Sequence, residues 1–106
     1  MDLVSTWLAG RGYRSVARRL RIGRQEIDLV VTDGPQTVFV IVRVLRRPDV
    51  GAIELVDRRT ARRLVRALGR YFVEHPDVLN VRIDVVAVQL HDGGDRTLEH
   101  YVNAVP

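Results

Sequence analysis

Two carboxylates, Glu26 and Asp28, have the residue type and spacing best suited to chemistry in this chain. They lie two positions apart in the segment EIDLVVT, whose β-branched residues predict a strand. Side chains two residues apart on a strand point to the same face, and paired oxygens on a rigid strand are what a hard cation such as Mg²⁺ requires. The pair therefore predicts a metal site, and the alternative is the solvated face of an ordinary strand.

Arginine supplies every one of the 17 basic residues, and the net charge of +4 favours a nucleic-acid partner. In the segment predicted to form the longer helix, arginines recur every four residues and form a stripe that could follow phosphates. The alternative is a solvated helix face on which arginine stems cover apolar neighbours. The stripe consists of Arg58, Arg62, Arg66 and Arg70, and Arg46 and Arg47 precede it.

Several other kinds of catalytic site are not indicated. The chain has no Cys and no Lys, which excludes disulfides, thiolate metal ligands and amine nucleophiles. The three His residues, His75, His91 and His100, lack a metal-binding spacing such as HExxH, so structural or incidental roles are expected for them. Neither a nucleophile elbow nor a glycine-rich phosphate loop is present, so covalent hydrolysis and P-loop nucleotide binding are not expected.

Hydrophobic periodicity and turn residues predict the elements that position these side chains. Two helices are expected, one over residues 2–9 and a longer amphipathic one that begins near Glu54 or Asp57 and ends at His75. Five strands are expected, the last of them a strand or an extended tail: 13–21, 26–32, 37–44, 82–90 and 96–105. The first three should pair as an antiparallel meander.

The length of 106 residues predicts a single domain over residues 1–106. No apolar run approaches the ~20 residues that a membrane-spanning helix needs. The N-terminus lacks the basic start and apolar stretch of a signal peptide. These features predict a cytoplasmic protein with no membrane partner.

Six segments together resemble the YraN family, bacterial endonuclease-like proteins built on the PD-(D/E)XK nuclease fold. The resemblance runs in order over nearly the whole chain. It implies an α/β fold with a restriction-endonuclease-like core, in which elements in the order α-β-β-β-α-β form a mixed central sheet flanked by helices. The matching segments are WLAGRGYR (7–14), QEIDLVVTDG (25–34), VFVIVR (38–43), VDRRTARRL (56–64), RIDVVAV (82–88) and EHYVNAV (99–105).

The resemblance also implies where a catalytic site would lie, and this chain departs from the family there. Family members hold Mg²⁺ with an Asp on the second strand and the Glu of a Glu-x-Lys pair on the third, and the Lys positions the attacking water. Asp28 matches the Asp, and Glu26 matches the acid that precedes it. Ile41 replaces the metal-binding Glu and Arg43 replaces the Lys, whereas an assisting acid on the first helix would fall at Met1. The resemblance therefore implies a degenerate metal site at which Arg43 could pair with Asp28 in place of the metal.

Three functions stay open at this point. The first is a nuclease-fold protein, catalytically impaired and without a cofactor, that binds nucleic acid, most simply DNA, through Arg43, Arg46, Arg47 and the helix stripe without base specificity. The second is an active Mg²⁺- or Mn²⁺-dependent endonuclease in which Glu26 or Glu54 supplies a relocated metal carboxylate. The third is a protein-interaction module that forms a homodimer through exposed strand edges.

Overall fold

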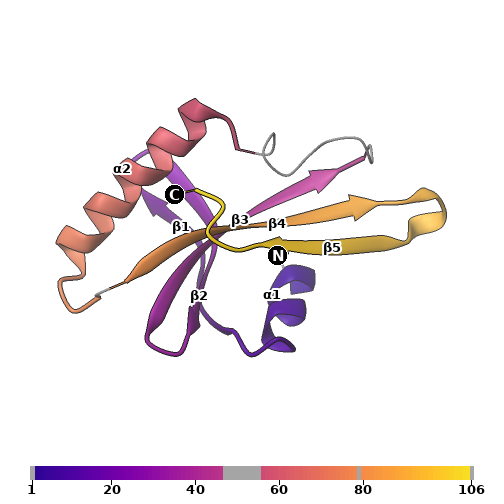
Figure 1. The fold of residues 1–106 in the computed structure, drawn as a ribbon, viewed down its shortest axis with the longest axis horizontal. Coiled ribbons are helices and arrows are strands. Elements are labelled where there is room, and N and C mark those ends of the chain that lie inside the picture. Colours follow the sequence, from indigo (N-terminus) through magenta and orange to yellow (C-terminus); the bar gives the residue numbers. More distant parts are fainter. Residues whose placement is uncertain (1, 47–55, 79, 106) are drawn as a thin grey trace.

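A mixed five-stranded β-sheet runs through the middle of the molecule, and a helix covers part of each of its faces (Figure 1). The computed structural model describes residues 2–46, 56–78 and 80–105. The strands lie side by side in chain order, from β1 at one edge to β5 at the other. The elements are α1 (Asp2–Ala9), β1 (Arg14–Ile22), β2 (Gln25–Asp33), β3 (Gln36–Leu45), α2 (Arg58–Glu74), β4 (Val81–Leu90), the 3₁₀ turn η2 (Asp92–Gly94) and β5 (Arg96–Tyr101).

Two tight turns fold β1, β2 and β3 into an antiparallel meander, as the sequence predicts. Each turn has two residues and begins with a glycine at φ 61°, Gly23 after β1 and Gly34 after β2. A positive φ at the first position of a two-residue loop suits the twist of the flanking strands, and glycine adopts it without a steric penalty. The meander therefore follows from local chemistry at two positions.

The helix α2 is the crossover between β3 and β4, which pair in parallel. It begins after Asp57, whose carboxylate accepts the backbone N–H of Thr60 at 2.7 Å, and this hydrogen bond lowers the pKa of Asp57. It ends at His75, whose Nδ1 lies 3.1 Å from the carbonyl oxygen of Tyr71. The predicted start at Asp57 and end at His75 are confirmed, and Glu54 lies outside the described residues.

Apolar side chains fill both faces of the sheet. On one face, α2 buries three residues against Phe39, Ile41 and their neighbours on β3 and β4. On the other face, α1 packs Val4 and Leu8 against the alternate residues of β2, β3 and β4. The three buried residues of α2 are Leu64, Ala67 and Tyr71. Because β3 and β4 are covered on both sides, they are almost continuously apolar, as central strands are.

The last strand is shorter than the predicted segment that ends at Val105. β5 stops at Tyr101, and a turn with Asn103 at φ 53° redirects the chain. The N–H of Ala104 then donates to the carbonyl oxygen of Ile83 at 2.9 Å, and Val105 becomes buried on the α2 side of the sheet. The C-terminal residues thus belong to the core without extending the sheet.

The predicted α/β class, the mixed sheet and the element order α-β-β-β-α-β are confirmed, and β5 follows as the predicted last strand. This arrangement is compatible with a restriction-endonuclease-like core. Within residues 2–46, 56–78 and 80–105, no helix is long and apolar enough to cross a membrane.

Candidate functional site

Asp28 lies where β2 and β3 separate. Backbone pairing between these strands runs from Asp33 opposite Gln36 to Leu29 opposite Val40 and stops there. Immediately beyond, Oδ2 of Asp28 accepts the backbone N–H of Val42 at 2.8 Å. The carboxylate thus accepts the N–H of Val42, which has no backbone partner on β2 once the pairing of the two strands has ended.

Side chains along β2 point alternately to the two faces of the sheet, and this alternation is interrupted at Asp28. Leu29 lies in the core on the α1 side, whereas Ile27, two residues away, lies in the core on the α2 side. On β1, the opposing residue is Arg19, which has φ 49° and is absent from the paired register. The assumption that Glu26 and Asp28 share a face depends on unbroken alternation, so the geometry does not support it.

The two carboxylates have different partners. Glu26 is exposed and lies 3.7 Å from the guanidinium of Arg21, whereas Asp28 is half-buried against β3. Within the described residues, no group of three or more His, Cys, Asp or Glu side chains could hold a metal ion. A Mg²⁺ site needs one or two carboxylates with water and phosphate oxygens around them. Among the described side chains, Asp28 already uses Oδ2 to accept an N–H and Glu26 lies beside Arg21, so metal binding by these two carboxylates stays a prediction.

Ile41 and Arg43 are the third-strand residues for which the resemblance implies a replaced Glu and a replaced Lys. Ile41 is 2% exposed and belongs to the core under α2. Arg43 is half-buried, and its Nη1 donates to the carbonyl oxygen of Val42 at 3.2 Å. The backbone N–H that Asp28 accepts and the carbonyl that Arg43 contacts thus belong to the same residue, and an ion pair between these two side chains stays a prediction.

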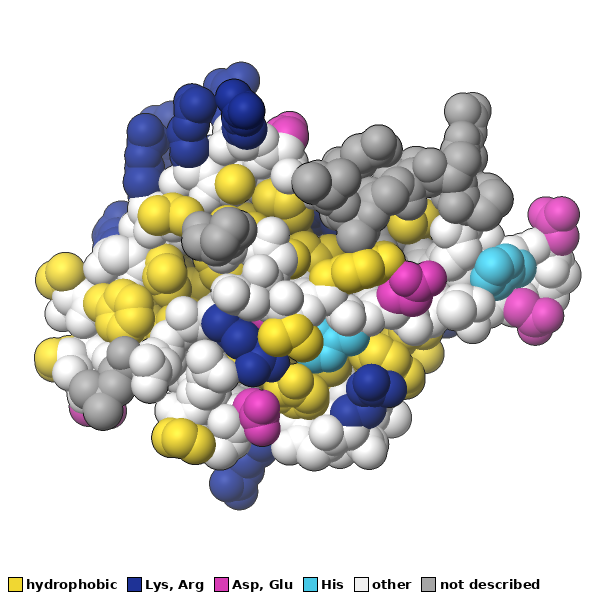
Figure 2. All heavy atoms as spheres, in the orientation of Figure 1, with side chains coloured by type: hydrophobic (Ala, Val, Ile, Leu, Met, Phe, Trp, Pro, Cys, Tyr) yellow, Lys and Arg dark blue, Asp and Glu magenta, His cyan; other side chains and the backbone are white. Residues whose placement is uncertain are grey.

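The predicted arginine stripe of α2 divides between two hollows. Arg66 and Arg70 line one hollow together with Arg63, while Arg62 and Arg66 line another beside Val105. An α-helix advances 100° per residue, so a spacing of four drifts by about 40° at each step. Arg63, Arg66 and Arg70 are three and four residues apart, and they form a straighter row than the predicted one. Figure 2 shows arginine side chains gathered over α2 at the upper left.

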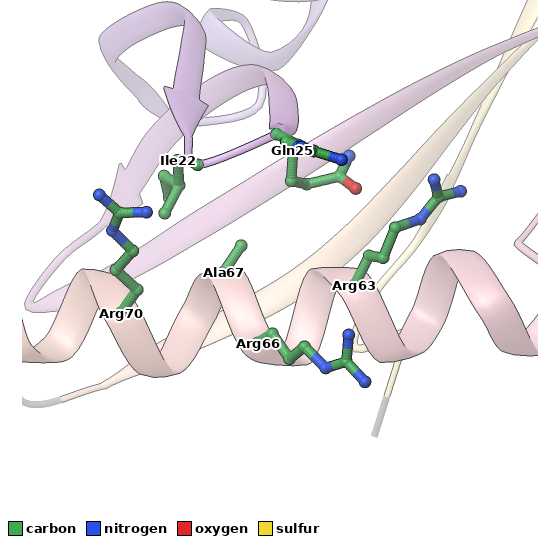
Figure 3. A pocket seen from close by; sticks show the side chains of 8 residues that line it. Ile22, Gln25, Arg63, Arg66, Ala67 and Arg70 are labelled. Carbon is green, nitrogen blue, oxygen red and sulfur yellow. The ribbon is translucent and has the colours of Figure 1, made fainter.

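The first of these spaces, which we call the arginine hollow, lies between α2 and the turn that joins β1 to β2 (Figure 3). Its volume is ≈ 270 Å³. Ile22 and Ala67, both buried, form its floor. Its full lining is Ile22, Gly23, Arg24, Gln25, Arg63, Arg66, Ala67 and Arg70.

Gly23 lies against one of the arginines of the hollow. A Cβ built on Gly23 would lie 3.0 Å from Nη1 of Arg70, so this guanidinium packs closely against the turn. Nε of Arg70 also donates to Glu74 at 3.1 Å, in an exposed ion pair one helical turn further on. Sequence reasoning omitted Arg24 and Arg63, although the break at Gly23 and the row spacing on α2 were the available signals.

Arg46, at the end of β3, lies elsewhere. It lines a hollow next to the β4–β5 turn with Arg96, and the acids Asp92 and Asp95 share that lining. Carboxylates in the same lining disfavour a phosphate, so this hollow suits a polyanion less well than the arginine hollow does. Arg47 lies outside the described residues.

A buried polar cluster is centred on Asp84, and the sequence did not predict it. Asp84 lies on β4, is 0% exposed, and accepts hydrogen bonds from the guanidinium of Arg82, from His100 Nε2 at 2.7 Å and from the N–H of Asn103 at 2.8 Å. Burial opposes its charge, but these hydrogen bonds together lower the pKa of Asp84. His100, for which a structural or incidental role was expected, belongs to this cluster through its hydrogen bond to Asp84.

Arg82 extends the cluster to the first loop of the chain. Its guanidinium donates to the hydroxyl of Tyr13 at 2.8 Å and to Oε1 of Gln36 at 2.9 Å, and hydrogen bonding to Asp84 raises its pKa. The ring of His100 packs edge-on against Tyr13 with centroids 5.5 Å apart. The cluster joins the segment after α1 to three strands, and its atoms satisfy one another, so its role is structural.

The described chain is similar to a set of bacterial proteins over most of its length. The model of UPF0102, an uncharacterised protein family, matches residues 2–88. A UPF0102 protein of Halorhodospira halophila is 44% identical over 87 residues, which cover 81% of this chain and 70% of the relative. Another, from Anaeromyxobacter dehalogenans, is 40% identical over 101 residues, which cover 93% of this chain and 75% of the relative.

Among solved structures, SfsA of Pyrococcus furiosus in complex with Ca²⁺ resembles 95% of this chain, which spans 60% of that protein's length. The TM-score is 0.45 and the sequence identity is 13%, so this distant likeness carries no argument about activity. The family match and the identities to relatives are decisive, and they agree with the six segments described above. The chain belongs to the UPF0102 family of uncharacterised proteins, which is the YraN family.

Proposed function

We propose that this protein binds nucleic acid through the arginine hollow and that its ability to cut nucleic acid at Asp28 is impaired. The observation that supports the binding role is that arginines from distant parts of the chain line the same hollow. Arg24 comes from the β1–β2 turn, and Arg63, Arg66 and Arg70 come from α2, far along the chain, yet all four line one hollow. Guanidinium groups bind phosphate through parallel hydrogen bonds, so four of them suit a phosphate backbone.

Little negative charge opposes these arginines. Within the described part of the chain, the one acidic side chain that forms an ion pair with any of the four is Glu74, on Arg70. Arg24, Arg63 and Arg66 are exposed. Phosphate contacts carry no sequence information by themselves, so binding through this surface is not sequence-specific.

The test is a titration of fluorescently labelled DNA at several salt concentrations, followed by anisotropy. If each of the four arginines neutralises one phosphate of a duplex, log K should fall with log[salt] at a slope of roughly −3.6. Affinity then drops about 150-fold between 50 and 200 mM salt. Absence of binding at 50 mM salt would overturn the proposal.

A matched pair of variants separates the hollow from general charge. Arg24→Gln with Arg63→Gln removes two residues of the hollow and should reduce the slope to roughly −1.8. Arg14→Gln with Arg59→Gln removes the same charge from exposed positions outside the hollow, and the slope should stay near that of the unmodified protein. Equal losses in both variants would assign the binding to net charge alone.

Impaired cutting is proposed because the residues around Asp28 do not suit a metal-bound water. Ile41 offers no side-chain oxygen, and Arg43 has a bulkier, planar guanidinium in place of the compact amine of a lysine. The assay is cleavage of a plasmid and of a Holliday junction with Mg²⁺ or Mn²⁺, and no cleavage is expected. Cleavage that disappears in Asp28→Ala would instead establish an active endonuclease with a relocated carboxylate.

A further inference from the structure

We infer that the arginine hollow holds one unpaired nucleotide, with its base on the apolar floor and its flanking phosphates on the arginines. This inference rests on the proposed function and adds the class of partner, which is single-stranded nucleic acid. It is carried by the combination of an apolar floor, a cationic rim and a volume suited to a single ring system.

The apolar floor has no use in a site for phosphate alone. Ile22 and Ala67 are 6% and 4% exposed, and they lie at the bottom of a hollow that four arginines surround. Because these two side chains present only a small area, the aliphatic stems of the surrounding arginines add to the apolar surface of the hollow. A phosphate group would gain nothing from that surface, whereas the face of a base would pack against it. Bases also stack on the planes of guanidinium groups, which the rim supplies.

The size of the hollow restricts what it can hold. Its ≈ 270 Å³ lies below the roughly 300–1,000 Å³ of pockets that hold drug-sized ligands. The hollow is therefore suited to a ligand no larger than a single nucleotide. The rest of a bound strand must therefore lie outside, on the exposed arginines.

The arrangement along α2 provides for the phosphates on either side of that base. Ala67 lies between Arg63 and Arg70, and Ile22 and Gln25 of the turn face it across the hollow (Figure 3). At 1.5 Å per residue, Arg63 and Arg70 are about 6 Å and 4.5 Å along the helix from Ala67, in opposite directions. One guanidinium thus stands on each side of the floor.

Polar groups at the rim are already oriented. Nε2 of Gln25 donates to the carbonyl oxygen of Glu26 at 2.9 Å, which holds the amide beside the hollow. Arg70 contacts the turn at Gly23 and pairs with Glu74. Groups that are positioned before binding lose less conformational entropy when a ligand arrives.

A duplex hides its bases in the stack, so a pocket for one base distinguishes single strands from duplexes. The test compares two labelled 12-mers by anisotropy at 50 mM salt, oligo-dT and a strand of the same length with abasic sites throughout. Both carry the same phosphates, and they differ in the bases alone. Base stacking in a site of this kind corresponds to roughly 5- to 150-fold in affinity, so oligo-dT should bind tighter by at least fivefold.

Three outcomes separate this inference from the proposed function. Equal affinity for both strands would overturn the base pocket and leave phosphate binding intact. No binding of either strand, or of a duplex, would overturn the proposed function itself. Poly-glutamate of equal charge bound as tightly as oligo-dT would show that the hollow recognises any polyanion, which also overturns the inference.

A filling variant tests the place of the base. Ala67→Met puts a flexible side chain into the hollow, and it should reduce the preference for oligo-dT over the abasic strand to less than twofold. Because Ala67 is buried, a thermal melt must first show that the variant folds. If it does not fold, ¹H–¹⁵N spectra of the unmodified protein replace it: thymidine monophosphate should shift the amides of Gly23 and Ala67 further than deoxyribose phosphate does at the same concentration. Shifts from both compounds alike, or from neither, would count against the base pocket.

Discussion

Replacing Asp84 by Asn tests whether the buried polar cluster holds the sheet together. The substitution keeps the size of the side chain and removes its charge. Arg82 would then keep a guanidinium that is 14% exposed beside an amide instead of its buried counter-charge. The new amide N–H₂ would also face donors, since Arg82, His100 and the N–H of Asn103 all point at the present carboxylate.

The expected cost is large for a chain of this size. Removing one partner of a buried, hydrogen-bonded ion pair costs about 3–5 kcal/mol, because the other charge stays buried without compensation. A domain has a total stability of about 5–15 kcal/mol, so Asp84→Asn should remove a substantial share of it. With a urea dependence of about 1.5–2 kcal/mol per molar, the unfolding midpoint should fall by roughly 2 M.

The measurement is urea unfolding followed by circular dichroism, with Asp33→Asn as the matched control. Asp33 contacts the same guanidinium at 3.8 Å, but its side chain is 55% exposed, so its loss should cost less than about 1 kcal/mol. A loss below about 1 kcal/mol in Asp84→Asn, or equal losses in both variants, would refute the assignment of this cluster as a structural element of the core.

Three further predictions concern stability. Because the pKa of Asp84 is lowered, its ionised form stabilises the fold above the ordinary pKa of 3.8, and this stabilisation is lost as the pH falls through the folded-state pKa. In an acid titration, the difference in unfolding free energy between the unmodified protein and Asp84→Asn should therefore close below about pH 4. Asp57→Ala removes the N-cap of α2 and should cost about 1 kcal/mol in thermal or urea unfolding, with Asp57→Ser restoring most of it. Leu64→Ala, at a residue 0% exposed under α2, should cost about 2–5 kcal/mol, whereas Val65→Ala, 47% exposed one position further, should cost much less; similar losses for the two would contradict the burial pattern.

The elements of this fold were predictable because local chemistry specifies them. A glycine begins each of the two tight turns of the meander, and the period of apolar residues in α2 marks its buried side. Asp57 as a helix cap follows from a hydrogen bond within one turn of the chain. All of these depend on residues a few positions apart, so the sequence contains the whole interaction.

The candidate site at Asp28 was predictable only in part. Sequence comparison places Asp28, Ile41 and Arg43 near one another, and the register of β2 and β3 agrees with that. The prediction that Glu26 and Asp28 share a face required a regular strand. The strand is irregular at Asp28, opposite Arg19, so the prediction loses its basis. A break of this kind arises where two strands diverge, which depends on what packs around them.

By itself, the sequence determined the α/β class, the order of the elements and the family. The tertiary structure alone decided which arginines lie together, since the arginine hollow unites Arg24 with residues about forty positions later, and the drift of a four-residue spacing around α2 leaves Arg58 outside it. It also placed Asp84, Arg82 and His100 in one buried cluster. The physical reason is the same for both: each charge is positioned by contacts between elements distant in the chain, and such contacts leave no periodic pattern in the sequence.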